Sequence, residues 1–275
     1  MAPSAEGISL VVTVTEITPH LQQLGAWRQA LQRLGGQHEI LVYSTGCDPS
    51  ALEKWLQPSI VTRWQHLDQP AGIGTALRTA LEHVRYPFLV HLTPDYPYTP
   101  ADLKRLWERI HLTDALLHKP PDLVNGCRTG LRTPLIWRIL SFGWQVFWRI
   151  ASGFPVYPQA PWHGWRAITI RWRCQWIYGI PLLDPFSGLK IYRTDFLKRF
   201  PLQSDGPFVH IEIAAKATFL TSLVDEILLT PCIAPIVLPP PAILRPDCWR
   251  CFRQPQFTRT MEQKDPAVFT PPLPA

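Results

Sequence analysis

Apolar positions in the first half of the chain alternate between short β-branched runs and stretches with helical spacing. Ile8–Thr15 is such a run, and in His20–Leu34 the apolar residues recur every three or four positions before Gly35 and Gly36. This alternation predicts βαβ units, and so an α/β domain with a mostly parallel central sheet flanked by helices. The predicted strands are Ile8–Thr15, Glu39–Tyr43, Ile60–Gln65, Phe88–Leu92 and Leu123–Gly126, and the predicted helices are His20–Leu34, Ser50–Gln57, Ile73–Val84 and Asp102–Ile110.

Four loops are expected to meet at the carboxyl edge of this sheet, where doubly wound sheets bind their ligands. Asp95 lies in one of them, and Gly72-x-Gly74 enters a predicted helix whose first N–H groups favour an anion such as a diphosphate. The alternatives are a turn aspartate before Pro97 and a glycine turn without a ligand. The four loops are residues 15–19, 44–49, 66–73 and 93–99.

Length and composition favour one domain with a C-terminal tail. With 275 residues, 46% of them apolar and 17% charged, the chain can bury a full core, and we expect a domain over residues 1–230. Residues 231–275 contain eleven prolines, which predicts an irregular tail that is disordered beyond about Gln254.

The longest uncharged run, Ile227–Leu244, contains five prolines, so no transmembrane helix is predicted. The first apolar run lacks a basic flank, which argues against a signal peptide.

The cysteines indicate a reducing environment. Their positions form no paired framework, which is typical of reduced thiols in a cytosolic protein. Cys248 and Cys251 have ligand-like spacing, but no second pair or nearby histidine completes a metal site. The six cysteines are at positions 47, 127, 174, 232, 248 and 251.

Basic and aromatic residues are concentrated in one segment. Between Leu123 and Leu183 there are seven arginines and seven tryptophans but no Asp, Glu or Lys, while the rest of the chain is close to neutral. Arginines with tryptophan rings suit amphipathic helices in the headgroup layer of a membrane, and we expect such helices in residues 135–180, within a membrane-surface insertion over 131–180. The alternatives are tryptophans in the core, a strand near 168–170, and a nucleic-acid groove, which would call for more lysines elsewhere. One predicted helix face is polar and carries Arg138, Ser141, Gln145, Arg149 and Ser152.

The order of motifs from Ile8 to Pro231 resembles family 2 glycosyltransferases of the GT-A fold. The likeness is to the branch of dolichol-phosphate mannose synthase and bacterial polyprenyl-phosphate sugar transferases. No single motif carries it. The matching segments are Leu10–Val14, Glu39–Val42, Ala71–Leu77, Asp95 with Pro100-x-Asp102-Leu103, Asp122–Arg128, Asp184–Lys190, and His210-Ile-Glu212 ahead of Ala214-Ala-Lys216.

The chain departs from the family pattern in the donor half. Where that family has Pro-x-Tyr-Asn-Glu, this chain has Thr13-Val-Thr-Glu16, and Ser44 stands in the region of the paired aspartates that hold the nucleotide base. The Asp-x-Asp motif becomes Thr93-Pro-Asp95. One carboxylate can still hold Mg²⁺ or Mn²⁺ together with substrate phosphates, or arginines can neutralise the diphosphate without a metal.

The resemblance implies a set of site residues. The implied catalytic residues are Asp95, Asp184 and Glu212, with Asp95 as the metal ligand. The implied donor-binding residues are Thr13, Glu16, Ser44, Gly72 and Gly74, and those for an acceptor phosphate are Arg128, Arg138 and Ser141. An Asx turn at Asp184, a solvent-facing Glu212 and a surface ion pair at Arg128 are the structural alternatives.

The resemblance implies an inverting glycosyltransferase that moves a sugar from a nucleotide-diphosphate sugar to a polyprenyl or dolichyl phosphate. The expected location is the inner face of a membrane, with no nucleic-acid partner. The alternatives are a catalytically silent GT-A paralogue that binds lipid phosphate or a partner protein, and, more distantly, a soluble nucleotidyltransferase. An acceptor oxygen that is already anionic needs no general base, so the lack of an obvious base does not argue against catalysis.

Overall fold

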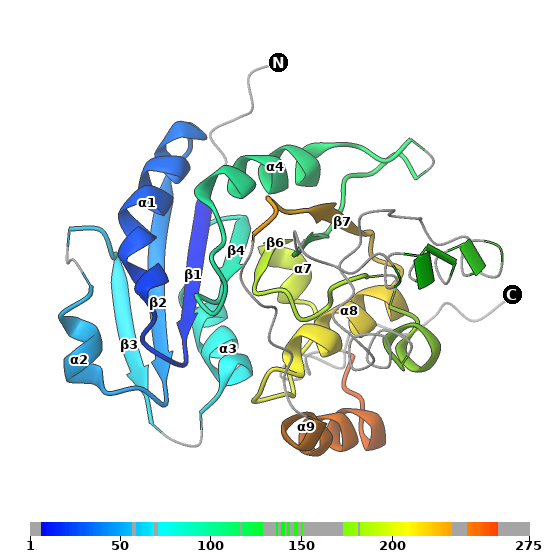
Figure 1. Cartoon of the computed structure of the whole chain (residues 1–275). Helices are drawn as coiled ribbons and strands as arrows, with labels where there is room; N and C mark the ends of the chain where they lie inside the picture. Colours follow the sequence, from blue (N-terminus) through cyan, green and yellow to red (C-terminus); the bar gives the residue numbers. More distant parts are fainter. Residues whose placement is uncertain are drawn as a thin grey trace, which may run out of the picture.

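The computed structural model describes most of the chain in one α/β domain (Figure 1). The described residues are 7–56, 59–68, 71–115, 117–128, 136, 139, 140, 142, 143, 146, 147, 150, 173–180, 182–232 and 241–257, with the backbone alone at 241–245 and 252.

A seven-stranded sheet forms the centre of the molecule, in the order β3-β2-β1-β4-β6-β5-β7. The first four strands in the chain are mutually parallel, and β5 and β7 are parallel to each other, while β6 runs antiparallel to its neighbours β4 and β5. The mostly parallel sheet expected from the sequence is therefore confirmed. The strands are β1 (Ile8–Val14), β2 (His38–Thr45), β3 (Arg63–Leu67), β4 (Phe88–Leu92), β5 (Leu123–Cys127), β6 (Leu189–Arg193) and β7 (Val224–Leu228).

Helices cover both faces of this sheet, and apolar side chains fill the two layers between them. α1 (Leu24–Arg33), preceded by the 3₁₀ turn η1 (Pro19–Gln23), and α4 (Pro100–His111) cover one face. α3 (Ile73–His83), α7 (Thr194–Leu197) and α8 (Val209–Phe219) cover the other. Two further helices are α2 (Pro49–Glu53) and α9 (Pro241–Arg253).

Each element expected before Asp122 has a counterpart in the structure, but some bounds differ. The helix expected over His20–Leu34 forms as the 3₁₀ turn η1 followed by α1, and the helix expected over Ser50–Gln57 ends at Glu53. β3 begins at Arg63 rather than at Ile60, because Leu41 of β2 pairs with Arg63. Ile60 and Val61 instead pack against the core as the chain approaches the sheet.

The Pro-rich tail is not irregular throughout, because residues 241–253 form α9. Pro241 suits the first helical turn, where an N–H would have no partner. Contacts with the 204–206 loop hold the helix in place: Asp247 accepts a hydrogen bond of 2.8 Å from Gly206 N, and Arg250 pairs with Asp205 at 2.8 Å. The expectation of irregular chain from 231 onward is therefore wrong for these thirteen residues.

Part of the segment between Leu123 and Leu183, which is rich in arginine and tryptophan, lies within the described residues. The eight described positions between 136 and 150 and residues 173–178 are helical. Arg138, Ser141 and the rest of the expected polar face lie outside the described residues, so the amphipathic pattern stays a prediction. Within the described part of the chain, none of the helices has the length and apolar character needed to cross a bilayer.

Candidate active site

The order of the strands reverses at β1 and β4, which are parallel neighbours. Ligands of such sheets bind at this switch point, so the carboxyl ends of β1 and β4 are the candidate site. From β1 the chain goes outward to β2 and β3 and then returns to place β4 on the other side of β1. The two loops that follow β1 and β4 are joined by a hydrogen bond of 2.7 Å from Thr18 Oγ1 to the carbonyl of Pro94. Glu16 and Asp95 are both exposed in these loops, so two carboxylates border the expected ligand crevice.

Asp95 is held in a defined position beside a glycine turn. Thr93 Oγ1 donates a hydrogen bond of 2.8 Å to Asp95 Oδ1, and Thr93 N donates to the carbonyl of Gly188 at 2.9 Å. A Cβ on Gly188 would come within 1.5 Å of Thr93 Oγ1, so only glycine fits at this position. Although Asp95 is exposed, the surrounding protein restricts its hydration and raises the pKa of its carboxyl, against the opposing charge of Arg128.

Arg128 and Asp184 form a buried bidentate ion pair next to this carboxylate. Arg128 Nε lies 2.7 Å from Asp184 Oδ2, and Arg128 Nη2 lies 2.9 Å from Asp184 Oδ1. Burial alone would raise the pKa of Asp184, but the guanidinium lowers it below the usual range. Burial alone would lower the pKa of Arg128, but Asp184 raises it, so both groups stay charged.

Two tyrosines that the sequence did not single out complete this cluster. Tyr98 Oη accepts a hydrogen bond of 2.6 Å from Gly188 N, and burial raises the pKa of its hydroxyl. The Arg128 guanidinium carbon lies 5.8 Å from the centre of the Tyr96 ring. Both tyrosines follow Asp95 in the loop after β4, and that proximity to a predicted site residue is the signal that could have identified them.

Arg128 does not have the exposed position that acceptor-phosphate binding requires. Its side chain is only 1% exposed, and two of its donors are engaged by Asp184. The structure therefore gives Arg128 and Asp184 a supporting position beneath the exposed Asp95. Arg138 and Ser141, the other two residues implied for that phosphate, lie outside the described residues.

Gly72 and Gly74 allow the backbone to pack closely and leave no open anion site between them. A Cβ on Gly74 would lie 2.1 Å from the carbonyl oxygen of Ser204, and one on Gly72 would lie 2.4 Å from that of Asp205. The N–H of Gly74 already donates to the Asp205 carbonyl at 2.8 Å. The 204–206 loop therefore packs against the start of α3, and the implied diphosphate contact at these glycines stays a prediction.

Thr13 and Ser44 are also internal, and of the implied donor-binding residues only Glu16 is exposed. The Thr13 hydroxyl lies 3.0 Å from His91 Nε2, and the Ser44 hydroxyl lies 2.9 Å from His66 Nδ1. Both residues are at most 2% exposed, so their hydroxyls face these internal partners, and their implied contact with a nucleotide stays a prediction.

Glu212 belongs to a different part of the molecule. Its two carboxylate oxygens accept hydrogen bonds from Gln203 N at 2.7 Å and Ser204 N at 2.8 Å, and Oε1 pairs with Lys216 Nζ at 2.7 Å. Both oxygens of Glu212 are thus engaged in holding the loop before α8, and its implied catalytic role stays a prediction.

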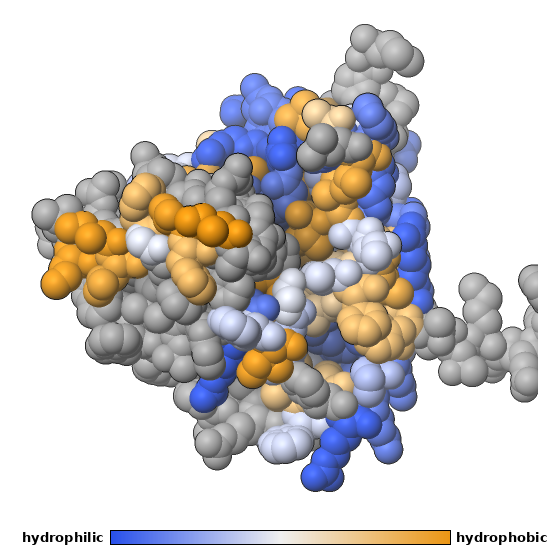
Figure 2. All heavy atoms as spheres, turned by 90° about the vertical axis from the view of Figure 1, so that its right-hand side faces the viewer, coloured by the Kyte–Doolittle hydropathy of each residue, from blue (hydrophilic) through white to orange (hydrophobic). Residues whose placement is uncertain are grey.

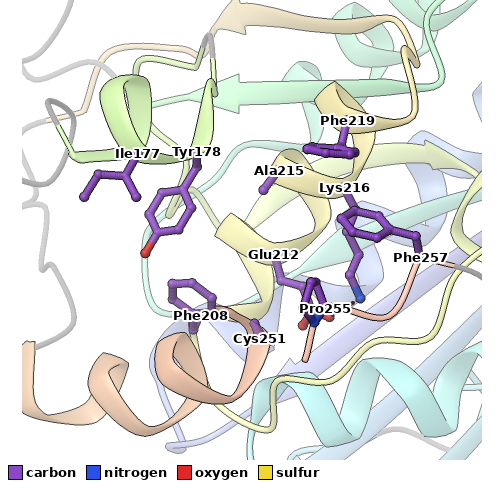
Figure 3. A pocket seen from close by; sticks show the side chains of 10 residues that line it. All are labelled: Ile177, Tyr178, Phe208, Glu212, Ala215, Lys216, Phe219, Cys251, Pro255 and Phe257. Carbon is purple, nitrogen blue, oxygen red and sulfur yellow. Dashed lines mark hydrogen bonds and ion pairs between the residues drawn. The ribbon is translucent and has the colours of Figure 1, made fainter. Parts of the chain in front are cut away.

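Glu212 and Lys216 also lie at the base of an apolar pocket of about 240 Å³ (Figure 3). The rings of Phe219 and Phe257 stack across one side of the pocket with their centres 4.8 Å apart. None of Asp95, Arg128 and Asp184 lines this pocket. The structure therefore brings those three residues together and places Glu212 in a separate environment.

The architecture is similar to that of solved sugar transferases. Glucosyl-3-phosphoglycerate synthase from Mycobacterium tuberculosis, in complex with Mn²⁺, UDP-glucose and phosphoglyceric acid, matches 90% of this chain and 81% of its own, with a TM-score of 0.60 and 15% identity. The chain has the GT-A fold. The same enzyme in complex with UDP matches with a TM-score of 0.57 and 17% identity, over 90% of this chain and 82% of that one. The sequence matches no protein-family model and no curated protein.

The Mn²⁺ in that complex raises the question of a metal in this chain. Within the described residues, no group of three or more His, Cys, Asp or Glu side chains could hold a metal ion. Both oxygens of Asp184 are paired with Arg128, which leaves Asp95 as the carboxylate of the cluster that faces solvent. The cluster thus does not fit a resident ion, but Asp95 fits a cation that arrives with a diphosphate and takes its other ligands from it.

Proposed function

We propose that this protein transfers a sugar from a nucleotide-diphosphate sugar to an acceptor that carries a phosphate. The observation that carries the proposal is the exposed Asp95 at the end of β4, fixed by Thr93 and beside the charged Arg128–Asp184 pair, at the switch point of a GT-A sheet. The likeness to a synthase solved with UDP-glucose supports the donor class.

The residues suggest how the reaction would be supported. Asp95 would orient the diphosphate, and a divalent cation bound with it would neutralise the departing charge. The Thr18–Pro94 hydrogen bond would keep the two loops around the donor together. An anionic phosphate oxygen can attack the anomeric carbon without a base, and a single in-line displacement would invert that centre.

For the acceptor we favour a polyprenyl phosphate presented at a membrane surface. Six apolar side chains of the helical positions between 136 and 150 are 48–82% exposed: Ile136, Ile139, Leu140, Phe142, Phe147 and Ile150. Figure 2 shows hydrophobic residues gathered on the side of the molecule that lies to the right in Figure 1. Between Leu123 and Leu183 the sequence also has six arginines besides the buried Arg128, and arginines together with exposed apolar side chains suit an anionic lipid surface.

The test is transfer from a labelled donor by the full chain. UDP-glucose and a panel of other nucleotide sugars are supplied with either polyprenyl phosphate or 3-phosphoglycerate, in Mn²⁺, Mg²⁺ or chelator. We expect transfer to polyprenyl phosphate, stimulated by the cation. Transfer to 3-phosphoglycerate alone would overturn the lipid acceptor and keep the donor class. The absence of both transfer and UDP binding by calorimetry would overturn the proposed function.

Asp95→Asn is the decisive variant. We expect it to lower turnover by about 100-fold or more, because orientation of the diphosphate is lost, while the fold is kept because the side chain is exposed. Asp195→Asn is the matched control, since Asp195 is also an exposed aspartate but lies in α7, outside the four loops of the candidate site. Equal activity of the two variants would remove Asp95 from the site.

The second candidate function is binding of a lipid phosphate by a silent GT-A paralogue. It is favoured by the internal hydrogen bonds of Thr13 and Ser44, which leave fewer side chains for a nucleotide. Retention of polyprenyl phosphate without any nucleotide binding would identify this function.

A further inference from the structure

Three buried polar residues lie side by side across three neighbouring strands of the sheet. Asn125 of β5 is in register with Lys190 of β6 on one side and with Glu226 of β7 on the other. Residues in register project to the same face of a sheet, and all three side chains are buried. Lys190 Nζ donates to Asn125 Oδ1, and Asn125 Nδ2 donates to Glu226 Oε1 at 2.5 Å. We call Lys190, Asn125 and Glu226 the polar row.

The polar row binds the backbone of the loop that carries Asp184. Glu226 accepts hydrogen bonds from Leu183 N at 2.8 Å and from Asp184 N at 3.2 Å. Asn125 Nδ2 donates to the carbonyl of Asp184 at 3.0 Å, and Lys190 Nζ donates to that of Pro185 at 3.0 Å. Four hydrogen bonds from three side chains thus fix residues 183–185.

Burying the ionisable groups of Lys190 and Glu226 costs free energy, and the sheet does not need them for its stability. Burial raises the pKa of Glu226 to about 7 and lowers that of Lys190 to about 7. Well-packed apolar residues in place of buried ionic groups are often neutral or stabilising. The contacts of the polar row with the 183–185 loop therefore account for it better than stability does.

We propose that Lys190, Asn125 and Glu226 are positioning residues, which hold the 183–185 loop so that Asp184 keeps the Arg128 guanidinium beside Asp95. This inference rests on the proposed function for its catalytic consequence, but not for the geometry. Arg128 N and Nε both donate to Asp184 Oδ2, at 3.2 and 2.7 Å, so a displaced loop would move the guanidinium with it. Since the Arg128 charge lowers the pKa of Asp95, its retreat would raise that pKa.

The test compares Glu226→Gln with Glu39→Gln. The first variant keeps the volume of the side chain but turns an amide NH₂ toward backbone N–H groups. Glu39 is the matched control, because it is a buried carboxylate that accepts hydrogen bonds from Ser9 Oγ at 2.6 Å and Arg85 N at 2.9 Å near the amino end of β2. Lys190→Met removes the contact with Pro185 and is expected to act in the same direction as Glu226→Gln.

Two readouts do not depend on turnover. In Glu226→Gln, amide hydrogen exchange at residues 183–184 should speed up by about tenfold or more, and the pKa of Asp95 measured by carboxyl NMR should rise. Neither should change in Glu39→Gln. Unchanged exchange and an unchanged Asp95 pKa in Glu226→Gln would overturn the inference, whether or not sugar transfer is found.

The third readout is kinetic, with the donor and acceptor identified in the transfer assay. Misplacement of a catalytic group lowers kcat more than KM, so Glu226→Gln should lose about tenfold or more in kcat with little change in the KM for the donor. Glu39→Gln should lower the melting temperature without this loss. Equal kcat in the two variants, per folded molecule, would show that the polar row has only a structural role.

Discussion

At the scale of single residues, the Arg128–Asp184 pair has the largest predicted effect. We expect Asp184→Asn to lower the free energy of unfolding by about 3 kcal/mol at pH 7, because it leaves a buried guanidinium without its counter-charge. Denaturant unfolding measures the loss. Asp195→Asn is the control: the Asp195–Arg199 pair is exposed, and its loss should cost less than about 0.5 kcal/mol. Equal losses in the two variants would contradict a buried pair.

The same pair predicts how stability depends on pH. Arg128 lowers the pKa of Asp184 in the folded protein, so the folded state binds this proton less tightly than the unfolded state does. The stabilisation is therefore fully present above the unfolded pKa of about 3.9 and is lost as the pH falls through the lower folded value. Acid titration of the wild type should show this loss. Asp184→Asn should lack it, and an identical acid transition in both proteins would contradict the assignment.

Sequence patterns identify some residues of the site and miss others for physical reasons. Asp95 and Glu16 follow predicted strands, and the carboxyl edge of a parallel sheet brings such residues together. Whether a polar side chain at a strand end faces solvent or an internal partner depends on the neighbouring strand, so the internal hydrogen bonds of Thr13 and Ser44 could not be predicted from the sequence. Asn125 and Lys190 could have been noticed as polar residues inside apolar strands, but their register with each other becomes visible only in the folded sheet.

At the scale of elements, the start of α3 depends on how closely the 204–206 loop approaches it. Gly74→Ala would bring a Cβ within 2.1 Å of the Ser204 carbonyl oxygen, so the loop would have to move. We expect a loss of about 2 kcal/mol in the free energy of unfolding. In α1, a Cβ on Gly25 would meet only Ile60 Cδ1 at an ordinary 3.5 Å, so Gly25→Ala should stabilise by about 0.5 kcal/mol. Effects of the same sign would contradict the close packing at Gly74.

The C-terminal elements show where composition misleads. Prolines make irregular chain the natural prediction for residues 231–275, yet α9 forms with Pro246 inside it. Asp247 and Arg250 bind the 204–206 loop, and Gln203 Nε2 donates to the Gln254 carbonyl at 2.8 Å. Such tertiary contacts outweigh local propensity and cannot be seen in composition. The strands and helices before Asp122 were predictable because their apolar period is strong and their turns are short.

At the scale of the whole molecule, the exposed apolar residues between 136 and 150 lie at one end, beyond the central sheet. In Figure 1 the helical residues between 136 and 150, coloured green, lie at the right, and α2 lies at the left beyond β3. A donor would bind at the ends of β1 and β4, and the lipid acceptor would approach it from the surface that carries the exposed apolar residues. This arrangement predicts that the protein binds membranes in one orientation.

That prediction can be tested by vesicle flotation. We expect the full chain to float with vesicles that contain about 30% anionic lipid and to bind less as salt is raised, because arginines contribute through screened charge. Ile139→Asp with Ile150→Asp should weaken binding by about tenfold or more, since each substitution puts a charge on an inserted face. Trp55→Asp is the control, because Trp55 is 36% exposed and follows α2 by two residues, and α2 lies at the opposite end of the molecule in Figure 1. If the bound fraction changes neither with lipid charge nor in the paired substitution, these apolar residues are not a membrane-binding surface. If the wild type forms dimers and the paired substitution converts them to monomers, the apolar face instead binds a second copy of the chain.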